Sequence, residues 1–289
     1  MYATTFGQAA DKPSFRHCAQ GVAWTIALVA LTAGVPTKLA AAEFRGVRLN
    51  VSDPQAAAQW YCKHLGGTLA ANGPEASFGS DRGGLAIRTV QFGKTTLEFV
   101  PAPISPAGRT VPGSVGSGLD HLGFGYADLD PAMKRFAETG VEIVSGIERE
   151  GPIRYAFIKD RWGTLIELVE DREIHGFHHV HLATTDPKAT LKWYTDVFGG
   201  RVTRFAGLLP GIRYGDVWVL VKTVKRPLAP TEGRSIDRLI WVESDARGAL
   251  DRFGARRIPP TVGQVAGGSK HILISGPDRV QLAITAPDR

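Results

Sequence analysis

The feature that most constrains the fold is an internal repeat. Residues 47–67 recur at 180–200, an offset of 133 residues, and residues 119–136 recur at 236–253, an offset of 117. The first pair shares an Asp-Pro, a Trp-Tyr and a Gly-Gly dipeptide in the same order. Offsets of this length indicate a duplicated structural unit, because the repeats of solenoid proteins are roughly 20–50 residues long.

Each copy of the unit has the sequence pattern of a strand, a helix and further short strands. The alternating stretch Phe44–Val51 predicts a strand. Asp53-Pro54 then supplies a helix N-cap followed by proline at the first helical position, and Gly66-Gly67 ends the helix. The pattern predicts four βαβββ modules, near residues 44–100, 119–170, 177–223 and 236–285.

The first 42 residues have the anatomy of a secretory signal peptide. Lys12 and Arg16 precede an apolar run from Gly21 to Val35, and small residues end the segment at Ala42. The run is shorter than the roughly 20 apolar residues that span a bilayer. We expect cleavage after Ala42 and a periplasmic or secreted product, with an uncleaved membrane anchor as the alternative.

Composition narrows the classes of partner. Cleavage removes Lys12, Arg16 and Lys38 with Asp11, which takes the formal net charge from +6 to +4, and it leaves Cys62 as the sole cysteine. A charged fraction of 21% and a hydrophobic fraction of 43% exclude intrinsic disorder. The basic residues are dispersed among acids, so we expect no nucleic-acid partner and no stable membrane association after cleavage.

One further segment points to a known family. Residues 160–168 read Asp-Arg-Trp-Gly-Thr-Leu-Ile-Glu-Leu. Together with the Asp-Pro, Trp-Tyr and Gly-Gly pattern, this segment resembles the vicinal oxygen chelate superfamily of glyoxalase I, extradiol dioxygenases, epimerases and antibiotic-resistance proteins. The resemblance implies an α+β fold in which four βαβββ modules pair into two cup-shaped mixed-sheet domains. We expect these domains at residues 43–172 and 173–289.

The resemblance also implies metal ligands on the first and fourth strands of paired modules. In the first module these positions fall on Gly46, which cannot bind a metal, and on Glu98. In the second module they fall on His121 and Glu167. We therefore expect Glu98, His121 and Glu167 to bind a divalent metal. One imidazole and two carboxylates suit Mn, Fe, Co, Ni or Zn better than a soft metal.

Physical chemistry supports these three residues independently. Glu98 and Glu167 each interrupt an apolar strand, where a bare carboxylate is costly unless it is paired or bound to a cation. Gly123 and Gly125 share the strand face of His121 and leave room for a ligand. The alternative is that both carboxylates pair with arginines and that His121 is an ordinary core histidine.

The second half lacks an obvious metal set. His179 occupies the first-strand position, but the matching positions are Leu220, Arg238 and Gln281. We interpret this half as a degenerate partner in which Arg238 and His271 bind an anionic group. The nearby histidines are interpreted as a connector plus one cavity histidine, His179. They are His175, His178, His179 and His181.

Two further segments belong to the expected cavity. Arg154 and Tyr155 precede the Glu167 strand and are predicted wall residues, although core packing explains Tyr155 equally well. Residues 101–118 are rich in Pro, Gly and Ser, which is compatible with either a lid or a slack connector.

Three functions follow from the resemblance. The first is an exported, metal-dependent lyase or isomerase of the glyoxalase I type, acting on a small oxygen-bearing substrate, with Glu98 or Glu167 as general base. The second is a metal-free binding protein of the bleomycin-resistance type. The third is an extradiol dioxygenase, which uses two histidines and one glutamate. A small-molecule partner is common to all three, and a homodimer is left open.

Overall fold

Four βαβββ modules make up the described part of the chain, as the repeat predicts. The structure is a computed structural model that describes residues 42–70, 86–103, 108, 110–264 and 270–285. The predicted signal peptide therefore lies, apart from Ala42, outside the described residues. No helix in the described part of the chain is long and apolar enough to cross a membrane.

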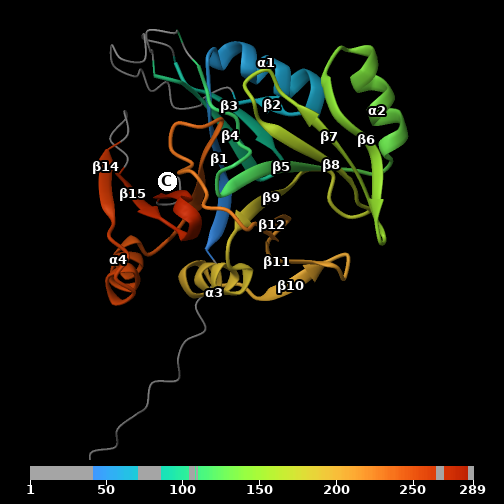
Figure 1. Ribbon diagram of the computed structural model, residues 1–289. Helices are drawn as coiled ribbons and strands as arrows, with labels where there is room; N and C mark the ends of the chain where they lie inside the picture. The colour runs from blue at the N-terminus through green and yellow to red at the C-terminus, as the bar shows by residue number, and fades with distance from the viewer. Residues whose placement is uncertain (1–41, 71–85, 104–107, 109, 265–269, 286–289) are drawn as a thin grey trace, which may run out of the picture. The chain divides into compact units, whose positions relative to one another are not determined.

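The modules follow one another in chain order (Figure 1). The first comprises β1 Glu43–Val51, α1 Pro54–Leu65, β2 Thr68–Leu69, β3 Arg88–Phe92 and β4 Thr95–Pro101. The second comprises β5 Leu119–Tyr126, α2 Leu129–Glu138, β6 Glu142–Glu150, β7 Ile153–Lys159 and β8 Leu165–Glu170. The third comprises β9 Gly176–Thr184, α3 Pro187–Phe198, β10 Val202–Phe205, β11 Leu209–Tyr214 and β12 Val217–Thr223. The fourth comprises β13 Ile236–Val242, α4 Ala246–Ala255, β14 Thr261–Gln264, β15 Lys270–Ser275, the short 3-10 helix η2 Pro277–Arg279 and β16 Gln281–Thr285.

Each α-helix begins in the same way. An aspartate carboxylate caps the first turn by accepting backbone N–H groups; in α1, Asp53 accepts from Gln55 at 2.9 Å and from Ala56 at 3.1 Å. The equivalent caps of the other helices are Asp128, Asp186 and Asp245. Gly66 ends α1 in the left-handed region, at a φ of 79°, which a residue with a side chain rarely adopts. The predicted start and stop signals of the helix are thus confirmed.

The modules combine into two eight-stranded mixed sheets (Figure 1). What we call the first sheet has the order β14-β15-β16-β13-β1-β4-β3-β2 and joins the first module to the fourth. The second sheet has the order β10-β11-β12-β9-β5-β8-β7-β6 and joins the second module to the third. The predicted α+β fold with two paired-module sheets is confirmed.

The predicted pairing of consecutive modules within 43–172 and 173–289 is wrong, because each of these ranges contains one module of either sheet. Connection length gives the reason. The link from β8 to β9 is the short segment Asp171–His175, so these modules pair as neighbours. Longer segments, 102–118 and 224–235, connect to the first and fourth modules and allow the chain to pass to the other sheet.

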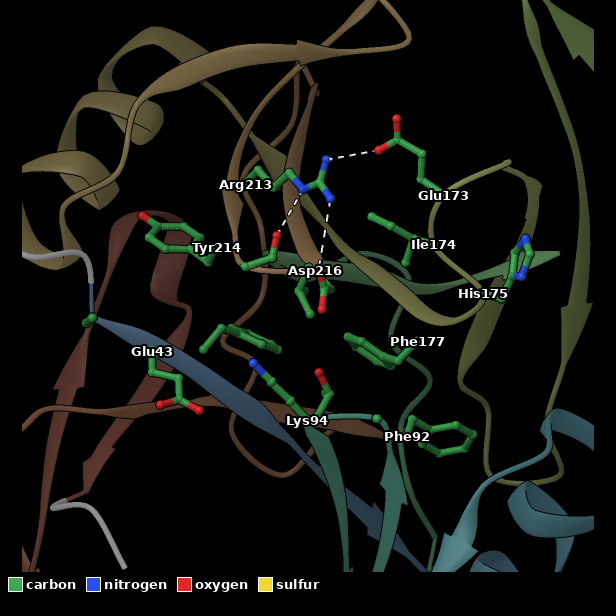
Figure 2. A pocket seen from close by; sticks show the side chains of 16 residues that line it. Glu43, Phe92, Lys94, Glu173, Ile174, His175, Phe177, Arg213, Tyr214 and Asp216 are labelled. Carbon is green, nitrogen blue, oxygen red and sulfur yellow. Dashed lines mark hydrogen bonds and ion pairs between the residues drawn. The ribbon is translucent and has the colours of Figure 1, made fainter. Parts of the chain in front are cut away.

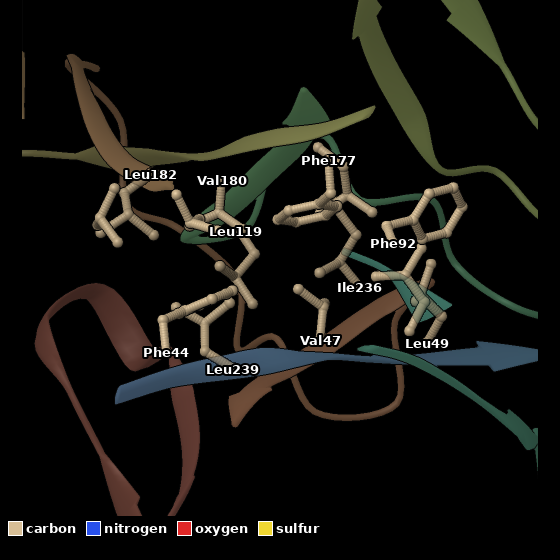
Figure 3. Packing of buried hydrophobic residues seen from close by; sticks show 14 of the residues in the cluster. Phe44, Val47, Leu49, Phe92, Leu119, Phe177, Val180, Leu182, Ile236 and Leu239 are labelled. Carbon is tan, nitrogen blue, oxygen red and sulfur yellow. The ribbon is translucent and has the colours of Figure 1, made fainter. Parts of the chain in front are cut away.

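The hydrophobic core lies between the two sheets (Figure 3). Val47 and Leu239 of the first sheet point toward Leu119 and Val180 of the second, and all four are buried. Because strand side chains alternate, the residues between these positions point to the outer face of each sheet. That outer face therefore carries the polar side chains considered below.

Two helices help to hold the sheets together. Tyr61 of α1 packs on Phe99 of its own sheet and donates a hydrogen bond to Asp160, in the β7–β8 turn of the other sheet, at 2.9 Å. The ring of Phe198, at the end of α3, stacks on Trp241 of the first sheet at a centroid distance of 4.1 Å. Each helix thus contacts both sheets.

Candidate metal centre

Four buried side chains converge on the outer face of the second sheet. They are His121 of β5, Glu167 of β8, and His179 and His181 of β9, and one ligand atom from each lies within 4.8 Å of the others. The His121 Nε2 atom lies 2.8 Å from Glu167 Oε2 and 3.1 Å from His181 Nδ1. The His179 Nε2 atom lies 3.3 Å from Glu167 Oε2. We call these four residues the histidine cluster.

Strand register brings the cluster together. β5 and β9 run antiparallel, with His121 opposite His181 and Gly123 opposite His179. β5 and β8 run parallel, with Gly123 beside Glu167. A side chain at position 123 would place its Cβ only 2.0 Å from Cε1 of His179. The space predicted beside Gly123 is therefore filled by the imidazole of His179.

A carboxylate behind His121 fixes the direction of its ring. Asp120 Oδ1 lies 2.8 Å from His121 Nδ1 and also accepts from Lys222 Nζ at 2.6 Å. With Nδ1 bound to Asp120, the Nε2 atom of His121 faces the cluster. Metal-binding histidines commonly have such a carboxylate on the other ring nitrogen.

His179 has an outer partner of a similar kind. Its Nδ1 lies 2.8 Å from Nδ1 of His178, and His178 Nε2 lies 3.5 Å from Asp171 Oδ2 in the link between β8 and β9. Alternation alone predicts that His178 points away from His179. Its ring instead contacts that of His179 at a centroid distance of 5.1 Å, so His178 belongs to the surroundings of the cluster.

The histidine cluster combines two neutral imidazoles, one ionised carboxylate and one imidazole with a raised pKa. Burial lowers the pKa of His179 to about 3 and lowers that of His181, so both imidazoles are neutral at pH 7. Burial also opposes the charge on Glu167, but His179 and His121 bring its pKa well below the usual range. Burial opposes the charge on His121, but the hydrogen bonds that its ring donates to Asp120 and Glu167 outweigh burial and raise its pKa. Metal binding would displace that proton.

A buried nitrogen atom tests whether a metal fits. His179 Nε2 is buried and makes no hydrogen bond of suitable geometry, although Glu167 Oε2 lies 3.3 Å away. Buried polar atoms in native proteins are nearly always paired, so this nitrogen calls for a partner. Three imidazoles and one carboxylate form a donor set suited to Zn, Fe, Co, Ni or Mn. The residues present therefore fit a divalent metal ion.

Comparison with known proteins places the chain in a family. Residues 43–168 and 176–237 match the model of the Glyoxalase/Bleomycin resistance protein/Dioxygenase superfamily. The chain belongs to this superfamily. The predicted resemblance is thus confirmed. No curated protein matches the chain.

Solved structures show the same fold at low identity. Glyoxalase I from Zea mays superposes with a TM-score of 0.67 at 14% sequence identity, over 84% of this chain and 92% of that one. A protein of Bacillus subtilis named as a "putative dioxygenase" superposes with a TM-score of 0.60 at 18% identity, over 86% of each chain. At these identities the likeness establishes the fold alone.

Glu98, a ligand expected from the superfamily pattern, is not in the cluster. Because the first module pairs with the fourth, Glu98 lies in the first sheet, where its Oε2 accepts from Arg48 Nε at 2.9 Å and Nη2 at 2.7 Å. The predicted metal set of Glu98, His121 and Glu167 is therefore wrong in its first member. A Cβ at Gly46 would lie 1.9 Å from the carbonyl oxygen of Thr96, so no histidine fits there.

The interpretation of the second half also needs correction. His179 and His181 lack a metal set only if they pair within residues 173–289. With β9 beside β5, they join His121 and Glu167 instead. The sequence does contain a signal for this arrangement: His179 and His181 are two residues apart, which places both side chains on one face of a strand.

Two aromatic side chains of β7 lie beside the histidine cluster. The ring of Phe157 meets that of His121 edge to face at a centroid distance of 5.2 Å, and Tyr155 lies next to Phe157 at 5.8 Å. The Tyr155 hydroxyl donates to Glu148 at 3.2 Å. The predicted wall role of Tyr155 stays a prediction.

The other predicted cavity residues lie elsewhere. Arg154 points to the opposite face of β7 and forms ion pairs with Glu170 at 2.6 Å and Asp130 at 2.9 Å. Arg238 and His271 lie in the first sheet, on β13 and β15. In the connector, Ser114 and Ser117 are buried, and the backbone N–H of Ser114 donates to Gly163. This part of the connector packs at a strand end and does not reach the cluster.

A separate cavity of about 640 Å³ opens where the ends of both sheets meet (Figure 2). Phe92 and Phe177 are among the aromatic residues that line it, and Figure 2 shows Arg213 bridging Glu173 and Asp216 at its rim. None of the four clustered residues lines this cavity.

Proposed function

We propose that the chain is a divalent-metal-dependent enzyme of the superfamily that acts on a small oxygen-bearing molecule. The observation that carries this proposal is the histidine cluster itself, in which ligand atoms from four buried side chains lie within 4.8 Å of one another. His121, Glu167, His179 and His181 would hold the metal. A bound divalent ion would act as a Lewis acid toward substrate oxygens.

The protein supplies orientation and a dry surface. Asp120 fixes the ring of His121, and His178 does the same for His179. Phe157 excludes water beside His121. Glu167 is the sole carboxylate of the cluster and is ionised at neutral pH, so it is the available proton acceptor for a lyase or isomerase reaction. Its low pKa, however, makes it a weak base and favours its role as a ligand.

An extradiol dioxygenase is the second candidate. The cluster contains three histidines and one glutamate, and two of these histidines with the glutamate would make the donor set of non-haem iron oxygenases. The ligand set predicted from the sequence has one histidine and two glutamates, which does not match this reaction. The observed pairing of modules replaces Glu98 with histidines and so removes that objection. In this reaction Glu167 would serve as a metal ligand, so its weakness as a base would not matter.

Metal analysis tests the proposal. We expect the purified wild-type protein to contain about one divalent metal per chain by mass spectrometry, and the double variant His179→Ala/His181→Ala to contain less than about a tenth of that. Glu98→Gln is the matched control, because Glu98 lies in the other sheet, and it should retain the metal. A wild-type protein that neither copurifies with metal nor binds any added divalent ion would overturn the proposal.

Substrate assays then separate the candidates. Oxygen uptake with catechols by the iron-loaded protein, abolished in the double variant, identifies the dioxygenase. Isomerisation or cleavage of a small hydroxycarbonyl compound without oxygen uptake identifies the lyase or isomerase class. Ligand-induced thermal stabilisation that is independent of metal, without turnover, identifies a binding protein of the bleomycin-resistance type.

We also propose that the protein is exported. The charged and apolar pattern of residues 1–42 supports this, as does the start of β1 at Glu43, directly after the predicted cleavage site. N-terminal sequencing of the full chain expressed in a bacterium should give Glu43 as the first residue of the periplasmic product. An intact N-terminus in the cytoplasmic fraction would contradict export.

A further inference from the structure

The centre of the first sheet carries a pair of arginines. Arg48 of β1 lies directly opposite Arg238 of β13, in the antiparallel pairing that joins the first and fourth modules. The repeat offsets of 133 and 117 residues match these positions to His181 and His121. Those two histidines face each other in the same way at the centre of the second sheet. The duplication has therefore produced one sheet with a histidine pair and one with an arginine pair.

The arginine pair is largely removed from water. The side chain of Arg48 is 12% exposed and that of Arg238 is 17% exposed. Like charges directly opposite each other on neighbouring strands are destabilising. Each guanidinium therefore has a carboxylate partner: Glu98 for Arg48, and Asp237 for Arg238. The four charges balance.

Several donor atoms remain without a partner among the described residues. Arg238 uses only Nε, toward Asp237, and Arg48 uses Nε and Nη2, both toward one oxygen of Glu98. The side chain of Gln281 lies beside Arg238 on the same face of the sheet. His271 lies close enough that the two arginines, after burial, lower the pKa of its imidazole.

We infer that this face of the first sheet binds a small carboxylate-bearing molecule between Arg48 and Arg238. The terminal nitrogens of a guanidinium match the two oxygens of a carboxylate, and arginine cannot ligate a metal. Among the described residues, the second sheet alone has a metal-type cluster, so a second metal site is not an alternative here. Because the four charges balance, a monoanion fits better than a phosphate dianion. The inference is independent of the proposed reaction in the other sheet.

Glu98 gives the binding site an internal competitor. Its carboxylate occupies the fork of Arg48, which is the position that a ligand carboxylate would share. Removing the charge of Glu98 should therefore strengthen anion binding, whereas removing the charge of an arginine should weaken it. Opposite effects from neighbouring residues separate a binding site from a merely structural ion pair.

The test uses acetate as the probe and the full mature chain, at constant ionic strength set with sodium chloride. Broadening of the acetate methyl resonance in nuclear magnetic resonance spectra reports binding. We expect saturable binding in wild type, at least tenfold weaker binding in Arg238→Gln, and several-fold tighter binding in Glu98→Gln. Arg238→Lys keeps the charge but loses the fork, so it should weaken binding while preserving the fold. Phosphate should compete less well than acetate.

The cluster in the second sheet provides the control. His121→Ala should leave acetate binding unchanged, because His121 lies in the second sheet and the proposed acetate site lies in the first. Loss of acetate binding in His121→Ala alone would assign the anion to the metal and overturn the inference. So would the absence of saturable binding in wild type, or equal affinity in wild type, Arg238→Lys and Glu98→Gln.

Discussion

Substitution of Gly123 by alanine tests how the histidine cluster is built. The added Cβ would lie 2.0 Å from Cε1 and 2.1 Å from Nδ1 of the His179 ring, where ordinary contacts are 3.4 Å or longer. The imidazole must therefore move by more than 1 Å. Metal–nitrogen bonds tolerate only about ±0.2 Å, so His179 is lost as a ligand in Gly123→Ala. We expect the metal affinity to fall roughly 100-fold, at the upper end of effects seen when a ligand loses its orienting partner.

The cost in stability should be moderate. His179 is 1% exposed and packs against other imidazoles, so its displacement resembles overpacking of a core, at about 1–3 kcal/mol. Gly125→Ala provides the contrast, because its Cβ would lie 1.9 Å from the backbone carbonyl oxygen of Ile174, which cannot rotate away. We expect more than about 3 kcal/mol there. Gly146→Ala is the neutral control, since nothing lies within 4 Å of its Cβ.

Two measurements decide the outcome. Urea unfolding with excess chelator gives the free energy of unfolding of the metal-free variants. Competition with a chromophoric chelator gives the metal affinity. Gly123→Ala should lose affinity while remaining folded, and Gly125→Ala should lose mainly stability. Wild-type metal affinity in Gly123→Ala would show that His179 is not a ligand and would refute this account of the cluster.

Three further predictions concern charge, packing and metal. Burial opposes the charge of Asp120, but His121 and Lys222 lower the pKa of its carboxyl group from 3.8 to about 2. The ionised carboxylate therefore stabilises the metal-free fold by about 2 kcal/mol above pH 4. Asp120→Asn should therefore lower the free energy of unfolding at pH 6, and its difference from wild type should shrink as the pH falls from 4 toward 2; a pH-independent difference would contradict this. Tyr61→Phe removes the buried hydrogen bond to Asp160 and should lower the free energy of unfolding by about 1–3 kcal/mol in urea titrations, whereas no change would deny this contact a role in joining the sheets. Saturating metal should raise the melting temperature of the chelator-treated protein by about 5–10 °C at 100 times the dissociation constant, and an unchanged melting temperature would count against the cluster.

Local signals in the sequence predicted the modules well. An aspartate cap, a proline at the first helical position and a terminal glycine act within one turn of helix, so Asp53, Pro54 and Gly66 specify α1 without knowledge of the rest of the chain. The alternation of strand residues likewise separated the core side of β1 from its outer side. These features depend on neighbours in sequence, and the repeat shows them more than once.

The partners of each module were not predictable from the same signals. The first strands of the four modules have similar sequence patterns, so the pattern of one strand does not specify which other strand it pairs with. The pairing of modules decides whether Glu98 can reach the cluster. On its own strand Glu98 has the pattern of a metal ligand, and only the placement of β1 beside β13 separates it from His121. The short link Asp171–His175 is the sequence feature that favours β5 beside β9.

The central pairing also explains how one duplicated fold can hold two different sites. The first strands of two modules meet antiparallel at the centre of each sheet, so corresponding positions on both strands face each other. Substitution at such a position changes one half of a facing pair, and a guanidinium opposite an imidazole would repel a cation bound there. The described strands contain both kinds of facing pair: Arg48 with Arg238 in one sheet, and His121 with His181 in the other. It follows that Arg48→His alone should not create a metal site, since the facing guanidinium of Arg238 would still repel the cation.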